Sequence, residues 1–505
     1  MLARPKSPMG STPRLAPWLR AAPAPARRDD AMAFYPASLV LLALWAALTF
    51  RSPGGGILVA IAALPFGMFA AVEASGMSLR AAHLAAVLTM VVCTLQHLAQ
   101  PAEERSLRLS PAGLALLAFA AYGVISATLL VRLFEGQVMV FPVSLGAVGP
   151  AISYNFQSTT APVHPSNSNI SQLAYVLVAC AFFLYLESLV RRRGLDWAER
   201  GLVAAAVLNI VLAVLDLIGA DAVLAPVRTA DYALLDSQAV HGLARIIGGF
   251  SEPAPFGAFS AALFAYFALS FLIARRPLHG ALAAASLVCA LMSLSTSAIA
   301  ATACSLLFLL VHLRHVTIGG MPSGFAQIAL AALAAFVAIL VAVMVLTPAA
   351  QTVARVIDTI FLTKAQSHSG LERAAWAMAG MDAFRATYGL GAGIGSLRSN
   401  GLLPTLLGSV GLPGVTLYAL FLWFAFGRRA PTPAADGARR VYLSARVGAL
   451  TALTTAMLVA VVPDPSLLLM TFAAFAAASW QLGRVPPARV PAAAARPLGD
   501  ARGAT

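Results

Sequence analysis

The sequence contains few charged residues. Only 11% of its 505 residues are Asp, Glu, Lys or Arg, whereas 60% are hydrophobic, and the mean hydropathy is +0.82. Soluble domains carry roughly a quarter charged residues, so this scarcity excludes a soluble globular protein. No polar segment is both long and able to form a core of its own. The composition therefore predicts an integral membrane protein.

Several sequence patterns that would indicate particular chemistry are missing. The cysteines lie within or at the ends of apolar runs, without CxxC neighbours or metal-like spacing to histidine, and are interpreted as small hydrophobic residues. They are Cys93, Cys180, Cys289 and Cys304. No DxD or EF-hand-like acidic cluster occurs, so we expect no catalytic metal and no cofactor. No internal repeat stands out, which argues against a transporter built from inverted halves.

Long apolar runs are abundant instead. Unbroken runs of the length that a bilayer requires recur along most of the chain, and they favour helices. The expected spans are about 34–50, 56–74, 80–99, 110–131, 171–190, 201–220, 254–274, 280–296, 298–313, 325–347, 403–427, 441–462 and 466–482. We therefore predict an all-α, polytopic membrane bundle of about twelve or thirteen transmembrane helices.

The formal net charge of +14 comes from basic residues gathered in short loops and in the two tails. The loop residues are Arg191, Arg192, Arg193, Arg275, Arg276, Arg428, Arg429, Arg439 and Arg440. This is the positive-inside pattern, so it predicts that these loops and the C-terminus are cytoplasmic and that nucleic acid is not a partner. Counting spans from these loops places three longer segments on the opposite face of the membrane: 132–170, 221–252 and 348–402.

The chain divides into a transmembrane domain, residues 32–482, and two tails. Residues 1–31 form a basic Ala/Pro-rich tail, and residues 483–505 form a cytoplasmic one. Thirteen spans with a cytoplasmic C-terminus would place the basic N-terminal tail outside, which conflicts with its charge. Either one of the first three spans does not cross, or Met32 is the true start; the sequence leaves both explanations open.

The third of these segments begins with an amphipathic stretch, residues 353–361, which we expect to lie along the membrane surface. Ser369 followed by Glu372 forms a capping box that predicts a helix from Gly370 to near Gly389. Arg373 would lie in the first turn, where a cation opposes the helix dipole. We therefore expect Arg373 to hold an anion such as a phosphate.

Alternating glycines follow this helix, at Gly389, Gly391, Gly393 and Gly395. No strand precedes them, so they do not form a dinucleotide-binding motif. The run predicts a flexible turn that brings Arg398 back toward the membrane. A backbone nest for an anion is the alternative.

A second polar stretch, RIIGGFSEPAPFG at residues 245–257, precedes an apolar run that does not need it. RIIGGFSEP, with Arg245, Gly248, Phe250 and Pro253, resembles the Arg-spacer-Gly-Phe-Pro motif of the O-antigen ligase and polymerase superfamily. SGLERAAW, YGLGAGIGS and LLGSVGLPGVTLY resemble that family's large periplasmic loop and the helix that follows. The resemblance covers residues from about 110 to about 480.

The resemblance implies a multi-pass glycosyltransferase of the bacterial inner membrane. Its partners would be a glycan linked to undecaprenyl pyrophosphate, membrane lipid, and chain-length regulator and flippase proteins. The ligases carry a His-Asn pair where this chain has Arg398-Ser399-Asn400-Gly401, and the missing histidine favours a polymerase of exopolysaccharide, capsule or O-antigen. An O-antigen ligase remains the alternative. A transporter of lipid-linked sugar or polysaccharide is the second alternative, although it would usually need charges at mid-membrane.

Arginines on the periplasmic face are the candidate substrate-binding residues, because arginine grips phosphate bidentately and keeps its charge. They are Arg245, Arg373, Arg385 and Arg398, with His368 as a further candidate whose alternative role is that of a plain loop residue. Glu252 is the candidate catalytic base, and an ion pair with one of the arginines is the other interpretation. We expect Arg245 and Arg373 to face one cavity.

Overall fold

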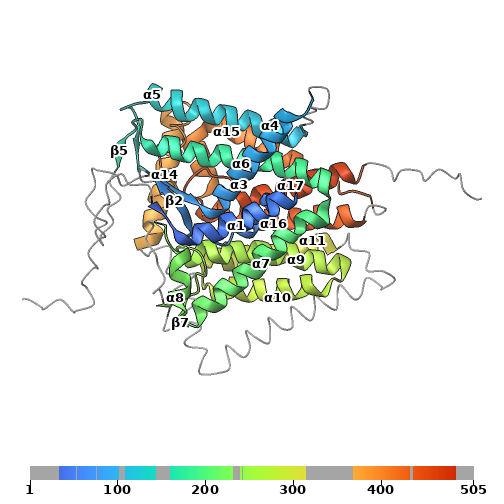
Figure 1. Ribbon diagram of the computed structural model, residues 1–505. Coiled ribbons are helices and arrows are strands. Elements are labelled where there is room, and N and C mark those ends of the chain that lie inside the picture. Colours follow the sequence, from blue (N-terminus) through green and yellow to red (C-terminus); the bar gives the residue numbers. More distant parts are fainter. Residues whose placement is uncertain are drawn as a thin grey trace, which may run out of the picture.

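The computed structural model describes residues 33–52, 54–74, 77–101, 109–143, 160–230, 239–240, 243–313, 368–432 and 436–484. Most of these residues are helical and form a polytopic bundle with several helices long and apolar enough to cross a membrane, so the predicted fold class is confirmed. Figure 1 shows that most of the helices lie roughly side by side along one direction.

Among the described residues, seven helices are long and apolar enough to cross a membrane. They are α3 (Ala81–Ala99), α4 with its continuation (Pro111–Leu133), α6 (Asn167–Arg193), α7 (Leu195–Leu217), α9 (Pro253–Ala274), α15 (Leu402–Phe426) and α16 (Asp436–Val459). The shorter apolar helices are α1 (Pro36–Arg51), α10 (Pro277–Met292), α11 (Thr296–Leu313) and α17 (Leu467–Leu482).

Further helices and strands complete the described fold. The helical ones are α2 (Gly56–Ala62), α4 proper (Pro111–Ile125), the π-helix η3 (Ser126–Leu130), α5 (Val131–Leu133), α8 (Asp221–Leu224), the 3-10 turn η4 (Ala225–Val227) and α14 (His368–Ala386). The strands are β1 (Ala33–Phe34), β2 (Ala70–Ala74), β3 (Met77–Arg80), β4 (Met139–Val140), β5 (Ala161–Pro162), β6 (Ala239–Val240) and β7 (Leu243–Ala244). All their pairings are antiparallel, in the orders β1-β2-β3, β4-β5 and β6-β7.

Helix α9 is the centre of the bundle. In the most apolar stretch of this helix, 72% is buried inside the protein, more than in any of the other six long apolar helices described. The helix packs against α10, α11 and α16. Small residues allow this close approach: a Cβ on Gly257 would lie only 2.3 Å from Ser293 Oγ. Helices in lipid gain little from hydrophobic burial, so such tight packing supplies much of their association energy.

One end of the bundle collects the basic loops. Arg191 donates a hydrogen bond to Gln481 Oε1 at 2.9 Å, and the Arg428 guanidinium lies 4.0 Å from the Trp480 ring centroid. Arg276 and Arg440 both contact Glu199. We call this the basic end and the opposite one the site end. The structure thus confirms that the loop arginines share one face; that this face is cytoplasmic stays a prediction.

The predicted span 56–74 is wrong as a helix. Helix α2 ends at Ala62, and β2 then joins a three-stranded sheet in which Phe34 faces Val72. Pro65 interrupts the run, and a Cβ on Gly67 would lie 2.6 Å from the Phe250 ring. A seven-residue helix is about 10 Å long, against a hydrocarbon core of about 30 Å.

The short helix α2 agrees with one of the two explanations for the charge of the basic N-terminal tail, namely that one early span does not cross the membrane as a full helix. Most other predicted spans agree with the helices to within a few residues: 80–99, for example, corresponds to α3 and 254–274 to α9. The predicted span 325–347 and the amphipathic stretch 353–361 lie outside the described residues.

Candidate functional site

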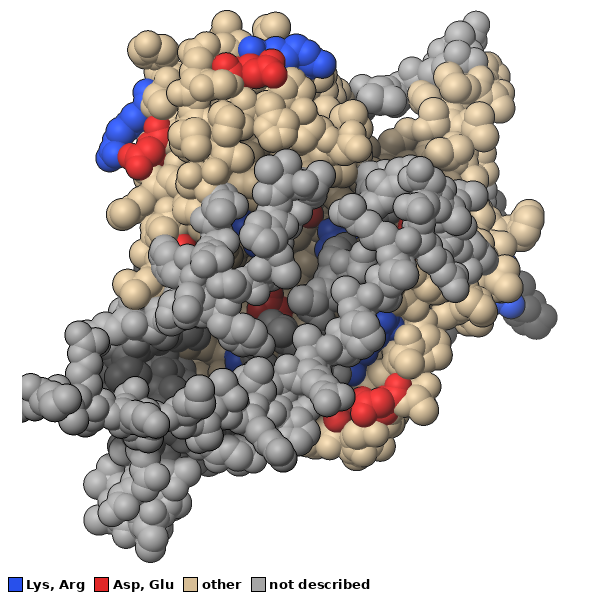
Figure 2. All heavy atoms as spheres, turned by 90° about the vertical axis from the view of Figure 1, so that its left-hand side faces the viewer, with Lys and Arg blue, Asp and Glu red and all other residues tan. Residues whose placement is uncertain are grey.

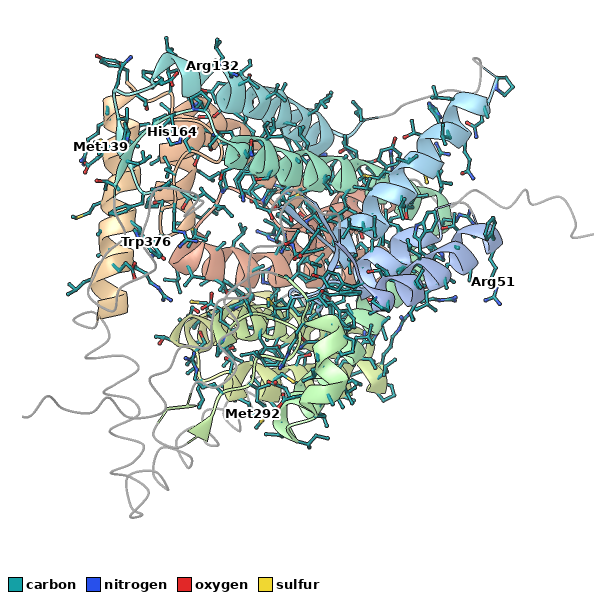
Figure 3. The ribbon with its side chains drawn as sticks, turned by 60° about the vertical axis from the view of Figure 1, so that its left-hand side comes forward. Arg51, Arg132, Met139, His164, Met292 and Trp376 are labelled. Atoms are coloured by element: carbon teal, nitrogen blue, oxygen red, sulfur yellow. The ribbon has the colours of Figure 1, made fainter. Side chains whose placement is uncertain are left out.

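Helix α14 covers part of the site end. Figure 3 shows it standing across the ends of neighbouring helices, with the labelled Trp376 on it. The described helix includes His368 and Ser369, so the predicted start at Gly370 is two residues late. Its end agrees with the prediction: Gly389 N–H donates to Phe384 O at 2.9 Å and Tyr388 N–H to Arg385 O at 3.1 Å. These two bonds form a Schellman cap.

The glycine run that follows contains the predicted turn, and its backbone is closely packed against its neighbours. Gly391, Gly393 and Gly395 all have φ between +80° and +104°, a backbone region that residues with a side chain rarely adopt. A Cβ on Gly393 would lie 2.1 Å from Val131 Cγ2, and one on Gly395 would lie 2.3 Å from Ser168 O. The run is therefore tightly packed between α6, η3 and α15, and it contains a turn in which Ser396 N–H donates to Gly393 O at 3.2 Å.

Breaks in two helices receive this segment. Helix α15 is interrupted at Gly411, which has φ 59° and ψ −166°, and η3 widens the end of α4. The N–H groups of Ala392 and Gly393 donate to the carbonyls of Gly408 and Ser409 at 2.7 and 3.0 Å. These donors already have protein acceptors, so the alternative prediction of an anion nest finds no support. Irregular backbone at membrane depth requires such internal pairing.

The glycine segment delivers Arg398 to the site end. The Arg398 N–H donates to Phe141 O at 2.7 Å, and its guanidinium lies over the Trp376 ring at 5.1 Å from the centroid. Its Nε is buried without a hydrogen-bond partner among the described residues. A cation on an indole face is attracted to the ring quadrupole without using its N–H donors. Arg398 is therefore held in place with donor capacity to spare.

The second predicted motif lies at the start of α9. Arg245 Nε donates to the Ser293 carbonyl at 3.2 Å, and its side chain is half-buried. Glu252 is the N-cap residue, with Pro253 at the first helical position, but its side chain does not cap the helix. Within the described part of the chain, the Glu252 carboxylate has no hydrogen bond or ion pair. Among the described residues Glu252 therefore interacts with Arg245 and Arg398 electrostatically, without an ion pair shorter than 4.0 Å.

Electrostatic coupling shows which charges lie together. Burial lowers the pKa of the Arg245 guanidinium, Glu252 acts in the opposite direction, and Arg373 lowers that pKa further. Burial also lowers the pKa of Arg398, against which Glu372 and Glu252 act. Glu252 therefore couples to both Arg245 and Arg398, and these pairwise interactions link five residues from segments far apart in sequence. Arginine side chains are effectively always protonated in proteins, so both guanidinium groups carry their charge near neutral pH.

We call Arg245, Glu252, Glu372, Arg373 and Arg398 the charged cluster. Three positive and two negative charges leave a net charge of +1, so the cluster favours an anion. Figure 2 looks onto the site end and shows basic and acidic side chains near the middle of this face as well as at its rim. The predicted approach of Arg245 and Arg373 is consistent with their electrostatic interaction.

Two predicted residues do not belong to the charged cluster in the described structure. Arg385 forms an exposed pair with Asp382 at 2.9 Å and lines a shallow groove between α14 and Pro404. It lies twelve residues after Arg373 on one helix, about 18 Å along the axis. His368 is the first residue of α14, and its side chain falls outside the described part of the structure.

Sequence reasoning missed two features of the site end. The Trp376 ring lies under the Arg398 guanidinium. The sequence indicates this role only weakly, because an aromatic residue in a helix usually serves packing. Asp464 forms a 3.5 Å pair with Arg80 beside the site end. The sequence does single out Asp464, because this acidic residue lies between two prolines in a short loop that joins two apolar spans. In the described residues, no three His, Cys, Asp or Glu side chains gather as metal ligands do.

Comparisons of the chain with protein-family models, with curated proteins and with solved structures find no match. The short motifs quoted above, together with the geometry of the site end, therefore carry the functional argument.

Proposed function

We propose that this chain is a polytopic inner-membrane polymerase of oligosaccharide repeat units linked to undecaprenyl pyrophosphate. The supporting observation is the charged cluster at the end of the bundle opposite the basic loops, in which Arg245 is electrostatically coupled to Glu252 and Arg373, and Arg398 to Glu252 and Glu372. Topology alone does not require arginines there, because the positive-inside rule concerns the cytoplasmic face. A lipid pyrophosphate at the membrane surface is a dense anion that suits such a group.

The charges fit the two halves of a glycosyl transfer. The leaving group is a pyrophosphate, so no acid has to protonate it, and arginines stabilise the charge that develops on it. The acceptor is a sugar hydroxyl, whose proton Glu252 takes as general base. Glu252 suits this role because, in the described structure, its carboxylate is not committed to a hydrogen bond or an ion pair. Glu252, at the start of α9, is electrostatically coupled to both Arg245 and Arg398, which supports a base beside the proposed anion site.

The polymerase is favoured over the ligase by the chain around Arg398. Arg398-Ser399-Asn400 stands where the ligases have a histidine, and the Ser399 hydroxyl and Asn400 amide are engaged in packing. Ser399 Oγ donates to Trp376 O at 3.1 Å, and Asn400 Nδ2 donates to Leu458 O at 3.2 Å. These two side chains therefore serve the fold, which leaves Glu252 as the candidate base of the described site.

Substitution of Arg245 tests the anion site. Arg245→Lys keeps the charge but loses the bidentate fork, so we expect shorter polymer and about tenfold or more weaker retention of undecaprenyl pyrophosphate by the purified protein. Arg132→Lys is the matched control, because Arg132 is an exposed arginine at the same end outside the charged cluster. Full polymer from normally expressed Arg245→Ala would refute the proposal.

Lipid-linked glycans from a deletion strain separate the two enzymes. A polymerase uses the same kind of unit as donor and acceptor, so its loss leaves single repeat units on undecaprenyl pyrophosphate. A ligase deletion instead strands long chains. Mass spectrometry of the extracted lipid-linked glycans measures their length, and long stranded chains would establish the ligase alternative.

A further inference from the structure

A buried aspartate–arginine pair holds the loop between Arg245 and Glu252. Asp216 lies in the last turn of α7, and Arg228 follows the 3-10 turn η4. A terminal nitrogen of Arg228 contacts Asp216 Oδ1 closely, and the two side chains are only 4% and 11% exposed. Asp221 is the second acidic neighbour of Arg228, at 3.9 Å, but it is 80% exposed. Neither Asp216 nor Arg228 belongs to the charged cluster.

Both members of the pair bind the same turn of backbone. Asp216 Oδ2 accepts hydrogen bonds from the N–H groups of Ile247 and Gly248 at 2.8 and 3.1 Å. Arg228 donates to the Gly248 carbonyl from Nε at 3.2 Å and from a terminal nitrogen at 2.6 Å. Hydrogen bonds to charged groups are roughly twice as strong as neutral ones. The pair therefore fixes the amide and the carbonyl of Gly248 together.

The turn has a conformation that depends on such support. Gly248 has φ +54°, and a Cβ there would lie 3.0 Å from the Phe256 ring. A Cβ on Gly249 would lie 2.4 Å from Pro65 O, and the Gly249 carbonyl accepts from Met68 N–H at 2.8 Å. The loop is therefore held from α7, from the segment before β2 and from α9.

We propose that Asp216 and Arg228 are the positioning residues of the charged cluster. Arg245 precedes the clamped turn by two residues and Glu252 follows it by four, so the orientation of the turn sets the directions of both side chains. This inference rests on the proposed function for its ligand class, a lipid pyrophosphate. Partners that orient binding residues commonly change affinity by about 10- to 100-fold when they are substituted.

Binding of undecaprenyl pyrophosphate to the full chain in lipid nanodiscs tests the inference. Asp216→Asn puts an amide NH₂ against Arg228 or the loop N–H groups, so we expect about 10- to 100-fold weaker binding. Asp221→Asn makes the same change beside the same arginine at an exposed position and should bind normally. Arg228→Lys restores the positive charge and should bind better than Arg228→Met. If Asp216→Asn only lowers the thermal midpoint and the folded protein binds normally, the inference is overturned.

A crosslinking measurement separates this inference from the proposed function. Arg245→Cys and Arg373→Cys are introduced after the four native cysteines have been changed to alanine, and a short bismaleimide joins the two positions. We expect Asp216→Asn to lose most of the crosslinked product and Asp221→Asn to keep it. An unchanged crosslink in Asp216→Asn overturns the positioning role. If instead Arg245→Ala binds undecaprenyl pyrophosphate normally, the proposed ligand is wrong while the crosslink still tests the clamp.

Discussion

Removing Glu199 should destabilise the bundle more than any other loss of a carboxylate at the basic end. Glu199 on α7 accepts two hydrogen bonds from Arg440 on α16, at 2.6 and 2.8 Å, and one from the Tyr266 hydroxyl on α9 at 2.7 Å. The side chains of Arg440 and Glu199 are only 3% and 4% exposed. The pair therefore ties three helices together in a region that water hardly reaches.

The size of the effect follows from this burial. Glu199→Ala leaves the Arg440 guanidinium buried, with Ser270 Oγ at 2.7 Å and Asp196 at 3.6 Å as its remaining contacts. Leaving one partner of a buried pair uncompensated costs about 3–5 kcal/mol. Asp196→Ala is the matched control, because Asp196 contacts the same arginine but is 74% exposed. Exposed pairs contribute about 0–1 kcal/mol.

Unfolding of the purified protein in detergent, followed by helix content across a denaturant series, measures both variants. We expect Glu199→Ala to lose stability by several times as much as Asp196→Ala. A double variant, Glu199→Leu with Arg440→Met, should recover most of the loss, because apolar residues often replace a buried pair without penalty. Equal stability of Glu199→Ala and Asp196→Ala, or a double variant worse than both singles, would refute the reasoning.

Three further predictions concern the site end. The first uses a cysteine-free background and cells with a permeable outer membrane. The Arg385 side chain is 71% exposed, so Arg385→Cys should react with an impermeant thiol reagent, whereas Arg429→Cys should react only after lysis. The reverse labelling pattern would invert the topology. Gly391→Ala should lower the free energy of unfolding by about 1–3 kcal/mol more than Gly136→Ala. Both glycines have positive φ, but only a Cβ on Gly391 would meet backbone, 2.6 Å away at Gly411 N. Equal stabilities of the two variants would contradict the close packing of the glycine segment. Trp376→Leu removes the ring under the Arg398 guanidinium, so it should weaken undecaprenyl pyrophosphate binding by about 2- to 30-fold, while Trp376→Phe should keep most of the affinity. Identical binding by the two variants would exclude the stacking role.

Features that depend on local pattern were predictable from the sequence. The apolar runs determined the all-α membrane fold, because a bilayer requires backbone groups to bond within their own segment. Basic loops determined which helix ends share a face, as Arg191 and Arg428 show at Gln481 and Trp480. The end of α14 near Gly389 followed from its glycine, although the start did not follow from the capping box.

Features that depend on contacts between distant segments were decided only by the tertiary structure. Residues 56–74 are apolar enough to read as a span, and it is the approach of Gly67 to Phe250 and the pairing of β2 with β1 and β3 that make them a short helix and a strand. The glycine run reads as flexible in isolation but is tightly packed, because η3, α6 and the break at Gly411 close around it.

The charged cluster shows the same division. Arginines on the face opposite the basic loops are visible in the sequence, since a span does not need them. Which of them meet is not visible, because Arg245 and Arg398 are 153 positions apart and Arg385 lies on the same helix as Arg373 yet pairs with Asp382 instead. Helical spacing alone fixes separations along one element, whereas coupling between elements depends on packing. That is why Asp216 and Arg228, which hold the loop from a third segment, emerge only from the folded chain.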